Sequence, residues 1–313
     1  MSTPVVSVIV PNYNHCAFLK IRIDSILQQS YDDFELILLD DCSSDKSREI
    51  LLSYKENVHV THIVFNDNNS GSVFKQWKKG ISLARGKYIW IAESDDYSDL
   101  DFLKETVGAL ESAPEASLVF TGSQMVDREG KNMLVDWDNF SFSAPMCVRY
   151  ESMHFLLKRM LWKNSIYNAS MVLFKRECYE RMACDEYQAF HYCGDWLFWI
   201  GICRQGSVVG IRRKLNYFRQ HMEKVSPGAE KRGLYFIEGG KIMKYMIDLL
   251  QLSFFQQLVI SGRTWKRLLK LTRKKSLLRQ EIIESCAPIL KNRMISIFVY
   301  SLDKFINISH LQH

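Results

Sequence analysis

Hydrophobic residues in the first third of the chain alternate between two kinds of spacing. Short apolar runs rich in β-branched residues predict buried strands at residues 5–10, 34–39, 59–65 and 88–92. Between these runs, apolar residues three or four positions apart predict helices. Those positions are Leu19, Ile23, Ile26 and Leu27, then Val73, Trp77 and Ile81, then Leu103, Val107 and Leu110. The alternation predicts an α/β fold with a doubly wound, mainly parallel sheet flanked by helices.

The pattern changes further along the chain. Residues 145–226 are mixed and rich in aromatic side chains, and they end in a Ser-Pro-Gly break. Beyond this break the pattern is helical and increasingly basic. We therefore expect a single α/β domain at residues 1–225 and a basic helical C-terminal extension at residues 226–313.

Positive charge is concentrated near the end of the chain. Residues 260–313 hold eleven Lys or Arg against three acids, a net charge of +8, whereas the whole chain carries +6. Such a segment predicts contact with an anionic surface. Between 263 and 279, basic residues alternate with Trp265 and several leucines, which predicts an interfacial helix on an anionic membrane. The alternative is a helix packed on the rest of the protein, and no nucleic-acid partner is expected.

The composition is that of a soluble globular protein, with 47% hydrophobic and 24% charged residues. None of the eight cysteines forms a Cys-x-x-Cys pair, which disfavours a zinc ribbon and a thioredoxin-like site. The first residues lack the character of a signal peptide, and no run of about 18 apolar residues occurs. We expect a cytoplasmic protein, bound at most peripherally to the inner face of the cell membrane.

Polar loops follow all four predicted strands. The carboxyl ends of parallel strands meet at one edge of a sheet, where ligands bind. Neither Gly-x-Gly-x-x-Gly nor Gly-Lys-Ser/Thr is present, which disfavours a dinucleotide oxidoreductase and a P-loop nucleotidase. The carboxylates after the second and fourth strands suit Mg²⁺ or Mn²⁺ held together with a diphosphate. The ring of Tyr13 can stack on a base, and Asp41 can accept a hydrogen bond from the ring N–H of uracil or thymine.

Four segments in order resemble the family 2 glycosyltransferases, which have the GT-A fold. They are VSVIVPNYN at 6–14, LLDDCSSD at 38–45, NSGSVFKQWKKGI at 69–81 and ARGKYIWIAESDD at 84–96. The resemblance extends from Val6 to about Ser226. The Phe-Lys-Gln-Trp piece is similar to a bacterial subgroup that builds surface polysaccharides.

The resemblance implies a donor site for a nucleotide-diphosphate sugar, with UDP as the expected nucleotide. The nucleotide-binding residues that it implies are Pro11, Tyr13, Asp41, Lys75, Glu93, Asp96 and Arg219. In the motif Glu93-Ser94-Asp95, the last carboxylate corresponds to the metal ligand, and His221 is a second candidate ligand for Mn²⁺ or Mg²⁺. Glu93 replaces the usual Asp, and Lys75-Gln76-Trp77 replaces a common Ala-Arg-Asn, so the contacts of Glu93 and Lys75 are less directly implied.

The resemblance also implies a general base for inverting transfer. Asp195 lies in the segment that resembles the acceptor side of the family, and it is the only acid between Glu186 and Glu223. Simpler interpretations stay open, because Asp195 can be a buried structural carboxylate and Lys75 an exposed helical lysine. His221 can likewise be structural.

We therefore expect a metal-dependent inverting glycosyltransferase. Its acceptor is expected to be a saccharide or a lipid-linked saccharide in surface polysaccharide synthesis. One alternative is a non-catalytic scaffold with the GT-A fold at the membrane. The other is a sugar-nucleotide pyrophosphorylase, which the Pro11-Asn12-Tyr13-Asn14 sequence disfavours, because those enzymes carry a Gly-rich signature with a Lys at this point.

Overall fold

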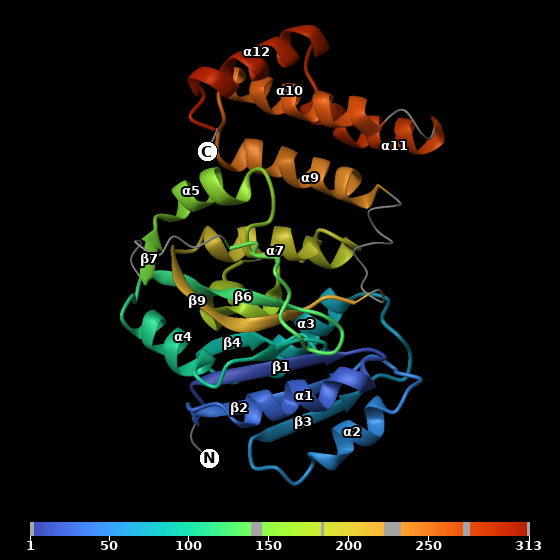
Figure 1. Ribbon diagram of the computed structural model, residues 1–313, viewed down its shortest axis with the longest axis vertical. Helices are drawn as coiled ribbons and strands as arrows, with labels where there is room; N and C mark the ends of the chain where they lie inside the picture. Colours follow the sequence, from blue (N-terminus) through green and yellow to red (C-terminus); the bar gives the residue numbers. More distant parts are fainter. Residues whose placement is uncertain (1–2, 139–145, 183–184, 222–232, 272–275, 312–313) are drawn as a thin grey trace. The chain divides into compact units, whose positions relative to one another are not determined.

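A computed structural model describes residues 3–138, 146–182, 185–221, 233–271 and 276–311. The chain forms two compact units (Figure 1). The first unit consists of Met1–Ser152, Ile166–Gln188 and Phe198–Met222, and the second of Met153–Ser165, Ala189–Leu197 and Glu223–His313. The second unit thus takes in two segments that precede residue 225, and the predicted domain boundary at that residue stays a prediction.

The first unit is built on one nine-stranded sheet with the order β3-β2-β1-β4-β8-β6-β9-β5, and β7 pairs with β9. The strands are β1 (Val6–Asn12), β2 (Phe34–Asp40), β3 (Val60–Phe65), β4 (Tyr88–Ile91), β5 (Tyr97–Ser98), β6 (Ala116–Val126), β7 (Cys147–Tyr150), β8 (Val172–Lys175) and β9 (Ser207–Arg219). Strands β1 to β4 are parallel, which confirms the four predicted strands and the predicted fold class. β8 runs antiparallel to both β4 and β6, so the sheet is mixed.

Helices cover both faces of the parallel part of the sheet (Figure 1). They include α1 (Cys16–Leu27), α2 (Ser47–Ser53), α3 (Val73–Leu83) and α4 (Phe102–Glu111), while α6 (Arg176–Glu180) contacts β8. Apolar residues of α1, α2 and α4 share one core with β1, β2 and β4. On the other face α3 lies tightly against β1, because a Cβ added at Gly80 would stand 2.3 Å from a methyl carbon of Ile9. The predicted helices are confirmed.

The second unit is mainly helical. It contains α9 (Leu234–Leu249), α10 (Phe254–Leu271), α11 (Ser276–Cys286) and α12 (Arg293–Ile306), and α7 (Gly194–Cys203) begins in it. α10 packs on α12, where a Cβ at Gly262 would stand 2.0 Å from the Ser296 carbonyl oxygen. None of the described helices combines the length and the apolar character needed to cross a membrane.

The predicted interfacial helix at 263–279 lies partly outside the described residues. Within α10, Leu268 is buried, the Trp265 indole N–H donates to the Lys291 carbonyl at 3.0 Å, and Lys266 Nζ donates to Ser301 Oγ at 2.7 Å. These contacts are internal to the second unit. Membrane binding by residues 263–279 stays a prediction.

Candidate functional site

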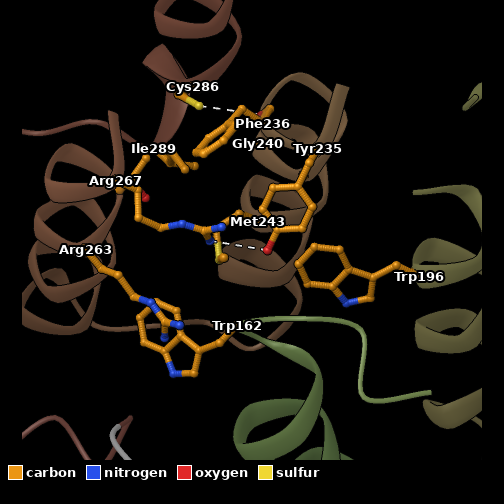
Figure 2. Close-up of a pocket in the computed structure, with 12 residues that line it drawn as sticks. Trp162, Trp196, Tyr235, Phe236, Gly240, Met243, Arg263, Arg267, Cys286 and Ile289 are labelled. Carbon is orange, nitrogen blue, oxygen red and sulfur yellow. Dashed lines mark hydrogen bonds between the residues drawn. The ribbon is translucent and has the colours of Figure 1, made fainter. Parts of the chain in front are cut away.

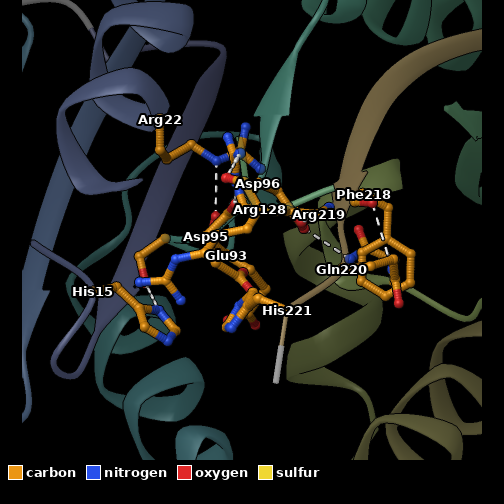
Figure 3. Close-up of polar contacts among 12 residues, drawn as sticks. His15, Arg22, Glu93, Asp95, Asp96, Arg128, Phe218, Arg219, Gln220 and His221 are labelled. Atoms are coloured by element: carbon orange, nitrogen blue, oxygen red, sulfur yellow. Dashed lines mark hydrogen bonds and ion pairs between the residues drawn. The ribbon is translucent and has the colours of Figure 1, made fainter. Parts of the chain in front are cut away.

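The motif after β4 brings a carboxylate and an imidazole together. Asp95 Oδ2 lies 2.9 Å from Nε2 of His221, which follows the end of β9 (Figure 3). The side chain of Asp95 is 12% exposed and that of His221 1%. His15, the residue before α1, lies 2.8 Å through Nδ1 from the Ser94 hydroxyl. Residues from two distant segments, His15 and His221, thus contact the Glu93-Ser94-Asp95 motif.

Two buried arginines flank this acidic motif, from α1 and from β9 (Figure 3). Arg22 donates through Nε to the Glu93 carbonyl at 2.9 Å, and among the described residues its two terminal nitrogens have no hydrogen-bond acceptor. Burial lowers the pKa of Arg22 to about 10, although the charges of Asp96, Asp95 and Glu93 oppose this shift. Arg219 donates through Nε to the Asp95 carbonyl at 2.8 Å. The two guanidinium groups therefore offset the repulsion among three neighbouring carboxylates.

Asp96 is fully buried and bonded by the protein itself. Its Oδ2 accepts hydrogen bonds from Asn168 Nδ2 at 2.7 Å and from Ser170 Oγ at 2.8 Å. Its Oδ1 accepts the backbone N–H of Arg219 at 3.0 Å. These bonds tie the motif to β9 and to the turn before β8, so Asp96 positions the loop. Contact of Asp96 with a nucleotide stays a prediction.

Glu93 forms a hydrogen bond with an aromatic residue of α3. The Trp77 indole N–H donates to Glu93 Oε1 at 2.8 Å. Burial, helped by the charge of Asp95, raises the pKa of Glu93 to about 8, while the bond from Trp77 opposes the shift. Both residues stand where the sequence departs from the pattern that the resemblance implies, and here they contact each other. The longer glutamate side chain and the indole therefore form one unit beside Asp95.

Replacing Trp77 by Phe should lower the free energy of unfolding by about 1–3 kcal/mol more than replacing Trp199 by Phe. Both indoles are buried in the first unit, and both substitutions remove the same atoms. Only Trp77 loses a hydrogen bond, because the indole N–H of Trp199 has no acceptor among the described residues. Urea unfolding of the two variants measures the difference, and equal losses would contradict a role for the Trp77–Glu93 bond.

Asp41 lies in the loop after β2, and residues of the neighbouring loop and of α3 hold its carboxylate in place. Asp41 Oδ1 accepts hydrogen bonds from Asn66 Nδ2 at 2.6 Å, the Ser70 backbone N–H at 2.9 Å and Gln76 Nε2 at 2.9 Å. Its Oδ2 accepts the Ser70 hydroxyl at 2.7 Å. Asp41 is 4% exposed. The carboxylate is thus fixed as an acceptor by side chains from the neighbouring loop and from α3.

Three other predicted nucleotide-binding residues, Pro11, Tyr13 and Lys75, differ in their exposure. Pro11 is buried at the end of β1, and the Tyr13 side chain is exposed just beyond it. Lys75 on α3 is exposed, and its Nζ donates to the Ser70 carbonyl at 3.0 Å. Lys75 therefore lies over the loop that holds Asp41, and its contact with a nucleotide stays a prediction.

Asp195 lies in the second unit, at the start of α7. Its Oδ2 accepts a hydrogen bond from Asn164 Nδ2 at 2.8 Å, and its Oδ1 accepts the Trp196 backbone N–H at 2.7 Å. Burial raises the pKa of Asp195 to about 7, although these two hydrogen bonds oppose the shift. A carboxyl group with a pKa near neutrality is suited to acid–base work. Its predicted role as the general base stays a prediction.

Several residues of the site could not be predicted from the sequence. Arg22 stands three positions after Leu19 on the apolar side of α1. A charged residue among apolar ones was the signal that could have identified it as part of a site. Trp77 was assigned to an apolar helix face, which hides its N–H donor. Asn168 and Ser170, which hold Asp96, have no local signal, because their partner lies more than seventy residues away.

The donor groups at Asp95 and His221 fit a divalent cation. Among the described residues, no group of three or more His, Cys, Asp or Glu is placed to hold a metal. Mg²⁺ is usually held by one or two carboxylates when a phosphate ligand supplies further oxygens, and Asp95 offers such a carboxylate beside the His221 imidazole. The residues present therefore suit an ion that binds together with its ligand.

The second unit has a pocket of its own, lined by aromatic and basic residues (Figure 2). It encloses about 440 Å³, the open solvent at its mouth included. The guanidinium of Arg263 lies 4.2 Å from the ring centre of Trp162, and that of Arg267 lies 4.8 Å from the ring centre of Tyr235. No acid is among its lining residues. Both cations are stabilised there by aromatic faces.

This chain belongs to glycosyl transferase family 2, whose family model matches residues 7–182. The resemblance found in the sequence is thereby confirmed. TuaG of Bacillus subtilis, named for teichuronic acid biosynthesis, is 32% identical over 176 residues, which are 56% of this chain and 63% of that protein. A glycosyltransferase of Haemophilus influenzae is 37% identical over 34% of this chain and 42% of its own length. The matched part is thus less than two thirds of each of these relatives.

Solved structures share the fold. TarS residues 1–349 of S. aureus, determined with UDP-GlcNAc, superimpose with a TM-score of 0.65 at 16% identity, over 91% of this chain and 80% of that one. The mannosyltransferase PcManGT of Pyrobaculum calidifontis, determined with GDP-Man and Mn²⁺, gives a TM-score of 0.52 at 15% identity, over 98% and 88% of the two chains. These likenesses confirm the GT-A fold.

Proposed function

We propose that this protein is an inverting glycosyltransferase that moves a sugar from a nucleotide-diphosphate donor, UDP-linked, to a hydroxyl of a saccharide or lipid-linked saccharide. The Asp95–His221 pair carries the proposal, because it sits at the carboxyl ends of the parallel strands, where a diphosphate binds in such sheets. The name of TuaG supports a place in bacterial surface polysaccharide synthesis. The UDP and UDP-GlcNAc bound by TarS support the donor class.

The chain's own residues would bind and orient the donor. Asp41, already fixed by four hydrogen bonds, accepts the N3–H of the uracil, and the exposed ring of Tyr13 packs on the base beside Pro11. Lys75, next to the same loop, adds positive charge on the nucleotide side. Binding of the base in this way orients the diphosphate toward Asp95.

The Glu93-Ser94-Asp95 motif would then bind the diphosphate and sugar of the donor. A divalent cation bound by Asp95 and His221 would neutralise the charge that develops on the departing diphosphate. Glu93, fixed by Trp77, contacts the sugar or ribose. Arg219 keeps the Asp95 backbone in place through its Nε–H. Asp195 takes the proton from the acceptor hydroxyl, and its raised pKa favours that step near neutral pH.

Product analysis separates this proposal from its alternatives. Incubation with UDP-sugars and saccharide acceptors should release UDP and form a glycoside of inverted anomeric configuration. A pyrophosphorylase would instead release pyrophosphate, and a scaffold would release neither. No observation favours either alternative. A cytoplasmic location with peripheral membrane association remains part of the proposal.

Replacing Asp41 by Ala should weaken UDP binding about tenfold or more, because an unpaired ring N–H costs roughly 1–3 kcal/mol. Asp45→Ala is the matched control. The Asp45 carboxylate accepts the backbone N–H groups of Cys16 and Ser47, so its loss should lower stability and leave UDP affinity unchanged. Calorimetric titration of both variants measures the affinities. Unchanged affinity in Asp41→Ala, or equal weakening in the two variants, would place the base elsewhere.

A further inference from the structure

The last helix of the second unit exposes an unusual amount of apolar surface. On α12, Phe305 is 86% exposed, Met294 82%, Phe298 68% and Leu302 44%. These four residues recur at three- or four-residue spacing, so they lie on one face of the helix. Ile295 and Ile306 on α12 and Ile308 just after it are also more than half exposed. A contiguous patch of this kind marks an interaction surface.

The opposite face of α12 shows that this orientation is fixed. Ser296 and Asp303 are fully buried, and Gly262 of α10 lies against Ser296. Asp303 accepts hydrogen bonds from the backbone N–H and the hydroxyl of Ser309, both at 2.6 Å. The chain after the helix is therefore tied back onto its inner face. The apolar stripe cannot turn inward without breaking these contacts.

The charges around the stripe indicate what it binds. Asp303 is the only acid on α12 and it is buried, whereas Arg293 and Lys304 are exposed near the two ends of the helix. The exposed surface of α12 is thus apolar and cationic, which complements an anionic lipid surface. Two copies of the chain facing each other through this stripe would bring like charges together, with no exposed acid on the helix to offset them.

We propose that α12 docks the protein on an anionic membrane surface, with Met294, Phe298, Leu302 and Phe305 entering the interface. Arg293 and Lys304 reach the phosphate layer at either end. This element differs from the segment 263–279 predicted from the sequence, whose described apolar residues include the buried Leu268. The inference goes beyond the proposed transfer reaction and does not depend on it, because membrane binding is measured without catalysis.

Flotation of the full chain with lipid vesicles tests the proposal. The protein should float with vesicles of phosphatidylcholine and phosphatidylglycerol, and binding should weaken in high salt, which screens exposed charges. The double variant Phe298→Ser/Phe305→Ser should bind at least about tenfold more weakly, since two large apolar side chains no longer enter the interface. The double variant Arg293→Glu/Lys304→Glu should lose the preference for anionic lipid.

A matched control uses two other exposed apolar residues. Val58 and Leu134, in the first unit, are 90% and 106% exposed, and Val58→Ser/Leu134→Ser should float like the unchanged protein. Circular dichroism melting checks that each variant is folded. Unchanged flotation of Phe298→Ser/Phe305→Ser, or equal binding to neutral vesicles, would overturn the proposal. A dimer that this variant dissolves, without vesicle binding, would assign the stripe to a second copy and also overturn it.

Discussion

Replacing Asp95 by Ala should reduce sugar transfer by at least about a hundredfold, since the carboxylate proposed to hold the metal is removed from a site of developing charge. EDTA should silence the unchanged protein in the same way, and Mn²⁺ or Mg²⁺ should restore it. The 2.9 Å contact between Asp95 and His221 motivates both expectations. Release of UDP from a UDP-sugar in the presence of acceptor measures the rate.

Asp101→Ala serves as the control for this substitution. Asp101 lies six residues further along and accepts a hydrogen bond from the Ser30 hydroxyl at 2.7 Å, on the exposed surface. Its replacement should leave transfer unchanged. A chain that transfers sugar at full rate in EDTA, or an active Asp95→Ala variant that responds to metal as before, would exclude Asp95 as the metal ligand.

Replacing Asp195 by Asn should lower the transfer rate by about a hundredfold to ten-thousandfold, the usual contribution of a general base. The amide keeps the shape of the carboxylate but cannot accept the acceptor's proton, so donor affinity should survive. Because the pKa of Asp195 is raised to about 7, the rate should climb with pH below neutrality and level off above it. The variant should lose this pH dependence. Glu186→Gln is the control, and it should keep both rate and profile.

The raised pKa of Asp195 also predicts how the free energy of unfolding depends on pH. Folding raises the pKa of Asp195 from 3.8 to about 7, so the native state binds the proton more tightly than the unfolded chain. The resulting stabilisation is fully present below the unfolded pKa and is lost as pH rises through 7. Urea unfolding across this range should show the loss in the parent and not in Asp195→Asn.

A full transfer rate in Asp195→Asn would move the role of general base to another carboxylate, with Glu186 next.

Local periodicity was enough to predict the first four strands and the helices α1, α3 and α4, whereas α2 was not predicted. Their signals are short and self-contained, because each parallel strand is buried on both faces and reads as an apolar run. β6, β8 and β9 lie where no such periodicity is visible. Their order in the sheet depends on pairings between distant segments, antiparallel for β8 with β4 and β6 and parallel for β6 with β9. The two segments that join the second unit from before residue 225 are non-local in the same sense.

In the candidate site, too, some residues could be predicted from local sequence and others depend on distant partners. Asp41 and Asp95 follow predicted strands, so their place at the sheet edge follows from the fold rule. His221 lies 126 residues after Asp95 and was linked to it only through the family resemblance. Arg22 was overlooked because a charged residue on a helix is ordinarily exposed, whereas this one is fully buried beside three carboxylates. Such burial depends on partners that no local pattern identifies.

The bond between Trp77 and Glu93 also bears on how this branch of the family can diverge. Shortening Glu93 to Asp alone would withdraw the carboxylate from the indole N–H by one methylene, and changing Trp77 alone would remove the donor. Each single step passes through a less stable protein, whereas the paired change need not. The two positions are therefore expected to show epistasis, so that the cost of changing Glu93 to Asp depends on which residue stands at position 77.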